Sequence, residues 1–317
     1  MPLFSVIIPV YNRPEEVNEL LDSLVNQTYM DFEVIIIEDG STISSEAVVN
    51  TYGQKLDIIY KKKENTGQGF SRNFAADFAK GEYLVFFDSD CLIPEDYFLV
   101  CSKYLNENVI DGWGGPDKAH SSFSLIQKAT GYTMSGFFTT GGIRGGKKHI
   151  GRFQPRSFNM GISKKAFLEV GGFAQTNLGE DVELSMRLLA GGYKMNLIPK
   201  AFVYHKRRTS LLQFFHQTKS FGKGRVLSGK KIKGGIKAVH FFPLLFTLGL
   251  FFWILSFWFI PALFQLGIPF LSIYFLLIFM DALAKTHNIL VALLSIITAV
   301  IQLTAYGVGF LLEWVRR

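Results

Sequence analysis

The chain has 317 residues, a formal net charge of +7 and 49% hydrophobic residues. Residues 241–314 are almost continuously apolar, whereas the first two thirds have the composition of an ordinary globular domain, which argues against a wholly soluble protein. We therefore expect a globular domain over residues 1–225, a basic linker over residues 226–240 and transmembrane helices over residues 241–317.

The positive charge is concentrated directly before the apolar region. Residues 206–237 contain ten Lys and Arg and no Asp or Glu, and the rest of the chain is mildly acidic. Basic residues beside a membrane segment attract anionic lipid headgroups and mark its cytoplasmic side. A basic run is also compatible with nucleic-acid binding, but its position favours membrane lipids as partners and no nucleic acid.

The two cysteines and the N-terminus both indicate the cytoplasm. Cys91 and Cys101 are expected to be free thiols, as is typical of a reducing compartment. The first residues lack the basic start and the small-residue cleavage site of a signal peptide. We expect a multi-pass protein of the inner (cytoplasmic) membrane, with its globular domain in the cytoplasm.

Apolar runs and helical patterns alternate along the first hundred residues. We expect strands at residues 4–11, 32–37, 58–60 and 83–87, and helices at residues 15–26, 44–52 and 70–80. This alternation predicts an α/β domain whose mostly parallel sheet is covered on both faces. Later we expect a long region over the site at residues 112–163, helices at residues 164–170 and 181–190, and a strand at residues 201–204.

Two aspartates directly follow the fourth expected strand. Asp88 and Asp90 lie where ligands bind parallel sheets, at the carboxyl end of a strand. Paired carboxylates suit Mg²⁺ or Mn²⁺, which prefer oxygen ligands and share their shell with substrate phosphates. The alternative is that the pair caps the next helix.

Further polar residues follow other strands or begin helices. Asp39, at the end of the second strand, can accept hydrogen bonds from a base or ribose, or can simply form an Asp-Gly turn. In the loop before the third helix, Gly67 allows close backbone approach and Arg72 can hold a carboxylate or phosphate. Asp181 begins a helix, either as a general base or as an N-terminal cap favoured by the helix dipole.

Five segments occur together in the order and spacing of a known family. They are SVIIPVYNR, EDGS, NTGQGFSRN, FFDSD and GEDVELSMRLLAGGY. Over about residues 3–225 the chain resembles the inverting family 2 glycosyltransferases with the GT-A fold. The resemblance implies a Rossmann-like catalytic domain before an all-α transmembrane region. It also implies transfer of a sugar from a nucleotide-sugar donor, with Mg²⁺ or Mn²⁺ as cofactor.

The resemblance implies roles for the residues that match these motifs. Asp39 would contact the nucleotide base, and Asp181 would deprotonate the acceptor. The metal and the donor diphosphate would fall to Asp88 and Asp90. His205 would also reach the metal or diphosphate, unless it is only a polar residue at a strand end. The other residues implied at the donor site are Pro9, Tyr11, Asn12, Gly67, Arg72 and Ser89.

Three departures from the family pattern bear on the donor and the product. Glu38 stands where an aspartate is frequent, and Ser71 stands where an alanine is frequent. Residues 215–221 lack the Gln-x-x-Arg-Trp motif of processive polysaccharide synthases, which predicts addition of one sugar at a time. A UDP-sugar is the default donor, with GDP- and dTDP-sugars left open.

The apolar tail predicts three membrane spans. Residues 241–260 and 289–312 are each long enough to cross a hydrocarbon core of about 30 Å, whereas residues 268–283 are marginal. A re-entrant middle run would leave two spans and place the terminal arginines inside, as the positive-inside tendency prefers. The remaining alternative is a buried helical core in a soluble protein.

A membrane tail suggests a lipid-linked acceptor. We expect a polyprenyl (di)phosphate that carries a growing cell-surface glycan, or alternatively polyprenyl phosphate itself. A nucleotidyltransferase could also use paired aspartates, but residues 9–16 lack its Gly-rich basic loop after the first strand. A membrane scaffold with a degenerate enzyme domain would have lost Asp88, Asp90 or Asp181, and all three are present.

Overall fold

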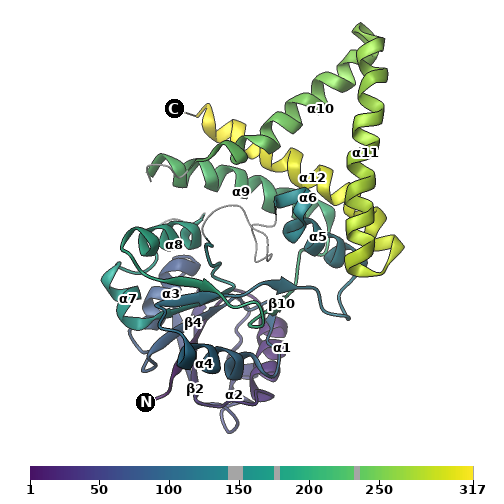
Figure 1. The fold of residues 1–317 in the computed structure, drawn as a ribbon. Helices are drawn as coiled ribbons and strands as arrows, with labels where there is room; N and C mark the ends of the chain where they lie inside the picture. The colour runs from purple at the N-terminus through teal and green to yellow at the C-terminus, as the bar shows by residue number, and fades with distance from the viewer. Residues whose placement is uncertain (142–152, 175–178, 232–235, 317) are drawn as a thin grey trace. The chain divides into compact units, whose positions relative to one another are not determined.

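The computed structural model describes residues 1–141, 153–174, 179–231 and 236–316 (Figure 1). Residues 142–152, part of the region expected over the site, lie outside this description. The chain forms two compact units. The first comprises residues 1–118 and 151–206, and the second comprises residues 119–150 and 207–317.

A seven-stranded sheet organises the first unit. Its strand order is β3-β2-β1-β4-β8-β6-β9, and β8 alone runs antiparallel to its neighbours. The four strands expected before residue 88 are therefore confirmed, with β2 and β3 longer than expected. The strands are β1 Phe4–Val10, β2 Phe32–Asp39, β3 Ile58–Lys63, β4 Tyr83–Phe87, β6 Gly112–Gly114, β8 Asn159–Ser163 and β9 Met195–Leu197.

Helices cover both faces of this sheet, because successive strand side chains point to opposite faces. In β1, Val6 and Ile8 pack into one apolar core and Ile7 into the other. The helix α1 begins with Pro14 at its first position and buries Leu20 and Leu24 against the first core. The helices of this unit are α1 Pro14–Val25, α2 Glu46–Asn50, α3 Gln68–Ala76, α4 Tyr97–Glu107, α7 Lys164–Glu169 and α8 Glu180–Ala190.

A second, smaller sheet has the order β5-β10-β7. It is built from β5 Cys91–Leu92, β7 Asp117–Lys118 and β10 Val203–His205. His205 lies directly opposite Cys91 in the antiparallel β5–β10 pair. This pairing brings the end of the strand expected at residues 201–204 back beside the paired aspartates.

The second unit is helical throughout its described elements. Three of its helices are long and apolar enough to cross a membrane, namely Ala238–Phe259, Pro261–Thr286 and Ile289–Trp314. The middle one is longer than its apolar run suggested, because the helix continues through Pro269. The unit comprises α5 Leu125–Ser135, α6 Phe137–Thr140, α9 Leu211–Lys231, η1 Ala238–Phe241, α10 Phe242–Phe259, α11 Pro261–Thr286 and α12 Ile289–Trp314.

The helix α5 packs with the C-terminal helices, although it lies between two strands of the first unit in sequence. Its Tyr132 hydroxyl donates to Asp281 Oδ2 at 2.7 Å, and Asp281 also accepts from Lys285 at 2.8 Å. Thr133 and Thr298 share a hydrogen bond of 2.6 Å between their hydroxyls. These polar contacts join α5 to α11 and α12.

Candidate active site

The site residues of the first unit gather where three neighbouring parallel strands end. Asn12 follows β1, Asp39 ends β2, and Asp88 follows β4. Because β2, β1 and β4 are adjacent in the sheet, their carboxyl ends share one edge. This is the edge at which doubly wound sheets bind ligands.

Asp39 fixes the loop that leads into α3. Its Oδ2 accepts from the Gly67 N–H at 2.9 Å, and its Oδ1 accepts from the Thr66 N–H at 3.0 Å and from Lys63. Gly67 has a φ of 94°, which a residue with a side chain rarely adopts. Burial acts to raise the pKa of Asp39, but the donors from Lys63 and Thr66 together outweigh it and lower that pKa.

Asn12 and Glu38 stabilise the turn after β2. The Asn12 side chain accepts from the N–H groups of Thr42 at 2.7 Å and Ile43 at 2.9 Å. The buried Glu38 carboxylate accepts from the Ser45 N–H at 2.8 Å and from the Tyr60 hydroxyl at 2.7 Å. The acid that departs from the family pattern is therefore tied into this turn.

Arg72 is a buried cation between two acids. Its guanidinium is 0% exposed and reaches Asp88 Oδ1 at 2.6 Å and Glu180 Oε1 at 3.4 Å. Burial, with the adjacent Asp181 charge, raises the pKa of Glu180, while Arg72 and Gln68 oppose that rise. One cation thus connects the end of β4 with the first turn of α8.

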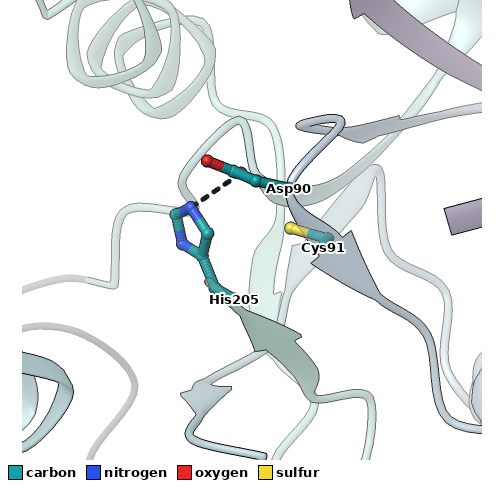
Figure 2. A group of neighbouring side chains, drawn as sticks. All are labelled: Asp90, Cys91 and His205. Atoms are coloured by element: carbon teal, nitrogen blue, oxygen red, sulfur yellow. Dashed lines mark ion pairs between the residues drawn. The ribbon is translucent and has the colours of Figure 1, made fainter. Parts of the chain in front are cut away.

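Asp90 takes different partners from Asp88. His205 Nε2 lies 3.1 Å from Asp90 Oδ1, as Figure 2 shows, and Arg13 Nη1 lies 3.2 Å from Asp90 Oδ2. The His205 ring packs on Phe158 with 4.7 Å between the ring centroids. Asp88 and Asp90, which flank Ser89 in the sequence, therefore contact different residues.

Asp181 lies in the first turn of α8, directly after Glu180. Its Oδ1 accepts from the Val182 N–H at 2.7 Å, and its Oδ2 lies 3.6 Å from Arg156 Nη1. The side chain keeps 20% of its surface exposed. A carboxylate in this position interacts favourably with the helix dipole and still presents an edge to an incoming group.

The remaining residues assigned to the donor site differ in their exposure. Pro9 lies in β1 opposite Ile37 and is partly exposed. Tyr11 is 51% exposed just after β1, whereas Ser89 is buried between the two aspartates. Tyr11 and Pro9 therefore offer surface to a ligand, and Ser89 offers little.

Several residues that the sequence reasoning did not single out contact this constellation. Lys63 pairs with Asp39 because the longer β3 places it opposite Asp39 in the β2–β3 register. Arg13 follows the first-strand motif and reaches Asp90, while Arg156 reaches Asp181. Had β3 been predicted at its full length, its register with β2 would have indicated that Lys63 lies opposite Asp39. The contacts of Arg13 and Arg156 could not be predicted in this way, because they join segments that are not neighbours in sequence.

The side chains present fit a divalent metal ion. An Asp90 carboxylate and a His205 imidazole converge at 3.1 Å, and the buried His205 Nδ1 has no hydrogen-bond partner among the described residues. Carboxylate and imidazole are donors that Mn²⁺ accepts, and Mg²⁺ accepts the carboxylate. Asp88 Oδ1 is held instead by Arg72, at 2.6 Å.

Comparison with known proteins matches part of the chain to parts of longer bacterial proteins. A poly(ribitol-phosphate) beta-glucosyltransferase of Bacillus spizizenii is 41% identical over 112 residues, which cover 34% of this chain and 18% of that protein. The minor teichoic acid biosynthesis protein GgaB of Bacillus subtilis is 28% identical over 211 residues, covering 64% of this chain and 23% of that protein. The similarity thus spans about a fifth of the length of these relatives.

Two solved structures share the fold. Mannosyltransferase PcManGT from Pyrobaculum calidifontis, in complex with GDP-Man and Mn²⁺, has a TM-score of 0.61 at 16% identity, covering 100% of this chain and 88% of that one. S. aureus TarS 1-349 has a TM-score of 0.52 at 20% identity, covering 78% of this chain and 70% of that one. The fold is the expected GT-A fold.

The profile of Glycosyl transferase family 2 matches residues 5–169, which is more than half of the chain. The matched part contains the Asp39 loop, Arg72 and both aspartates after β4. The chain therefore belongs to glycosyl transferase family 2.

Proposed function

We propose that this chain is a membrane-anchored inverting glycosyltransferase that moves one sugar from a nucleotide-sugar to a hydroxyl acceptor. The observation that carries the proposal is the buried Arg72, which contacts both Asp88 and Glu180. Arg72 thus links the end of β4, where a donor diphosphate would bind, to the first turn of α8, which bears Asp181. Chemistry at the anomeric carbon needs such groups held in near-contact geometry.

The donor's nucleotide would lie over the ends of β1 and β2. Asp39 and the backbone of the loop at Gly67 form a fixed polar surface there, and Tyr11 offers an exposed ring. The proposed donor-site set also includes Pro9, Asn12, Arg72, Asp88 and Ser89. A UDP-sugar is the default, and TarS 1-349 has been solved with UDP-GlcNAc. The GDP-Man complex of PcManGT keeps a GDP-sugar as the second candidate.

The metal site would be formed by Asp88, Asp90 and His205. Mg²⁺ or Mn²⁺, when bound there, would neutralise charge that develops on the leaving nucleoside diphosphate. Arg72 holds Asp88 in one orientation by a 2.6 Å contact, and Arg13 does the same for Asp90 at 3.2 Å. The two carboxylates are thus positioned before any ligand arrives.

Asp181 would act as the general base. Its carboxylate would take the proton of the acceptor hydroxyl while that oxygen attacks the anomeric carbon. The attack comes from the face opposite the leaving diphosphate, so the anomeric configuration inverts. Arg156, 3.6 Å from Asp181 Oδ2, would keep the carboxylate oriented.

The acceptor would be a lipid-linked glycan in cell-surface polysaccharide synthesis. Two observations support this class: the teichoic-acid relatives, and three helices long and apolar enough to cross a membrane. Catalysis would belong to residues 1–225, the basic linker to residues 226–240 and anchoring to residues 241–317. The catalytic part would face the cytoplasm at the inner membrane, because the basic residues precede the first apolar helix.

A transfer assay on the purified full chain tests the proposal. UDP-, GDP- and dTDP-sugars are supplied with Mn²⁺ and with either a lipid-linked glycan or polyprenyl phosphate. We expect one donor to yield a single-sugar product of inverted configuration, with loss on chelation and recovery on adding Mn²⁺ or Mg²⁺. Retention of configuration, or transfer that Asp181→Asn leaves unchanged, would refute the mechanism.

A further inference from the structure

A thiol lies beside the carboxylate and the imidazole of the proposed metal site. The ligand atoms of Asp90, Cys91 and His205 all lie within 4.8 Å of one another. In Figure 2 the Cys91 side chain and the His205 ring come from neighbouring strands and lie close together. The register explains this, because directly opposite residues of an antiparallel pair present their side chains on the same face.

The surroundings of this cluster favour a ligand at its centre. The Cys91 thiol is fully buried and donates to the Phe158 carbonyl oxygen at 3.6 Å. Of the described residues, none forms a hydrogen bond with the buried His205 Nδ1, whereas Nε2 is the ring nitrogen that faces Asp90. The Asp90 and His205 side chains keep 14% and 10% of their surface exposed, so an ion can reach the cluster from their side.

We propose that Cys91 is a third protein ligand in this cluster, which binds Zn²⁺ or Cd²⁺ through the Cys91 thiolate. The proposal rests on the metal role given above to Asp90 and His205. Sulfur is a ligand that softer ions select, whereas Mg²⁺ and Mn²⁺ are suited by oxygen. Binding transfers the thiol proton to solvent and forms the metal–sulfur bond.

The geometry requires only a small adjustment. A tetrahedral Zn²⁺ site places its nitrogen, oxygen and sulfur ligands about 3.5 Å apart. The three atoms already lie within 4.8 Å, so rotation of the His205 and Asp90 side chains can close the remaining gap. Zn²⁺ binds mixed donor sets more tightly than Mn²⁺ does, and it would therefore displace the ion that supports transfer.

Cobalt spectroscopy on the full chain tests the proposal without any activity measurement. A cobalt–thiolate bond gives a near-ultraviolet charge-transfer band that oxygen and nitrogen ligands do not give. The chain has only two cysteines, so the variant Cys101→Ala leaves Cys91 as the single thiol. We expect the band in the native chain and in Cys101→Ala, and its loss in Cys91→Ser. A folded Cys101→Ala protein without the band would overturn the proposal, even if Cys91→Ser did not fold.

Calorimetric titration supplies the second measurement. Cys91→Ser should weaken Zn²⁺ binding by at least about tenfold. A loss of that size is the minimum usually found when a residue that only hydrogen-bonds to a metal ligand is removed. Mn²⁺ binding should change little, and Zn²⁺ should inhibit Mn²⁺-supported transfer less in Cys91→Ser. Equal weakening for both ions would count against a thiolate ligand. A chain that shows the cobalt band but transfers no sugar would refute the proposed function and leave the metal inference standing.

Discussion

Arg72 Nη1 lies 3.4 Å from Glu180 Oε1, and these two residues, 108 positions apart in sequence, are both buried. Arg72 comes from α3 and Glu180 from α8, so their contact joins two helices. The same guanidinium reaches Asp88 and lies over the Phe173 ring at 5.2 Å. The positions of two acids therefore depend on a single buried charge.

Replacing Arg72 with methionine should strongly destabilise the fold. The change keeps most of the side-chain volume but leaves Asp88 and Glu180 without their cation. Removing one partner of a buried ion pair costs about 3–5 kcal/mol. Unfolding of the purified chain, followed by thermal shift, measures the loss.

The exposed ion pair between Lys62 and Glu46 is the matched control for that variant. Its 2.6 Å contact has both side chains about half exposed, so Lys62→Met should cost at most about 1 kcal/mol. Equal unfolding temperatures for the Arg72 and Lys62 variants would show that the buried contacts of Arg72 add no stability.

The Asp39 carboxylate should make stability depend on acidity. Its pKa is lowered from the usual 3.8 in the folded chain, because donors from Lys63 and Thr66 outweigh the effect of burial. The folded chain therefore binds a proton at Asp39 less readily than the unfolded chain does. The stabilisation of the fold by the Asp39 carboxylate is complete above the usual pKa, and it is lost as the pH falls through the lowered pKa of the folded chain. The unfolding-temperature difference between native chain and Asp39→Asn should shrink below about pH 4.

The exposed Asp57 provides the comparison for Asp39. Asp57→Asn should change the unfolding temperature little at any pH in the same series. A difference between native chain and Asp39→Asn that stayed constant from neutral to acid pH would contradict the assigned hydrogen bonds.

The carboxylate of Asp181 should be needed for turnover and dispensable for donor binding. Asp181→Asn keeps an oxygen that can accept from the Val182 N–H but removes the base. A positioned general base contributes about 10²–10⁴-fold, so kcat should fall by that factor while nucleotide affinity is retained. Single-turnover transfer and calorimetric titration with the nucleoside diphosphate measure the two quantities.

Glu183 lies in the same first turn of α8. A variant at Glu183 therefore distinguishes the loss of a general base from the loss of negative charge at the start of the helix. Its carboxylate binds Arg187, at 2.5 Å from Nε and 2.7 Å from Nη2. Glu183→Gln should lower stability but leave kcat close to the native value. If both variants lost turnover equally, the charge of the turn rather than a base at Asp181 would be responsible.

The contact between α9 and α12 should not tolerate a methyl group at Gly309. A Cβ there would lie 2.0 Å from the Lys219 carbonyl oxygen, so the helices would have to separate. Overpacking of this kind costs about 1–3 kcal/mol. Gly249→Ala in α10 is the control, since no atom of the described residues lies within 4 Å of a Cβ there. Unfolding temperatures in one detergent should fall for Gly309→Ala only.

Much of the catalytic fold could be predicted from local patterns. The apolar runs before residue 88 became β1 to β4, and the acids at their ends lie at one sheet edge. Such runs are informative because strands buried on both faces exclude polar residues. The three C-terminal helices were likewise predictable, although α11 begins at Pro261, before the apolar run expected from residue 268, and continues through Pro269.

The contacts that define the site were not predictable from local patterns. No spacing rule indicates that Arg72 is buried between Asp88 and Glu180, or that Cys91 lies opposite His205. Nor does the sequence between two strands of the sheet indicate that α5 folds with α11 and α12.

The sequence by itself determined the kinds of element, their order and the chemical types of the side chains at the strand ends, because periodicity and motif spacing act over neighbouring residues. The tertiary structure alone decided which charges are buried together and which donor atoms converge. Those outcomes depend on strand register and helix packing between segments that are far apart in sequence, 108 residues in the case of Arg72 and Glu180. There the cost of desolvating one group is offset only by a partner that folding brings to it.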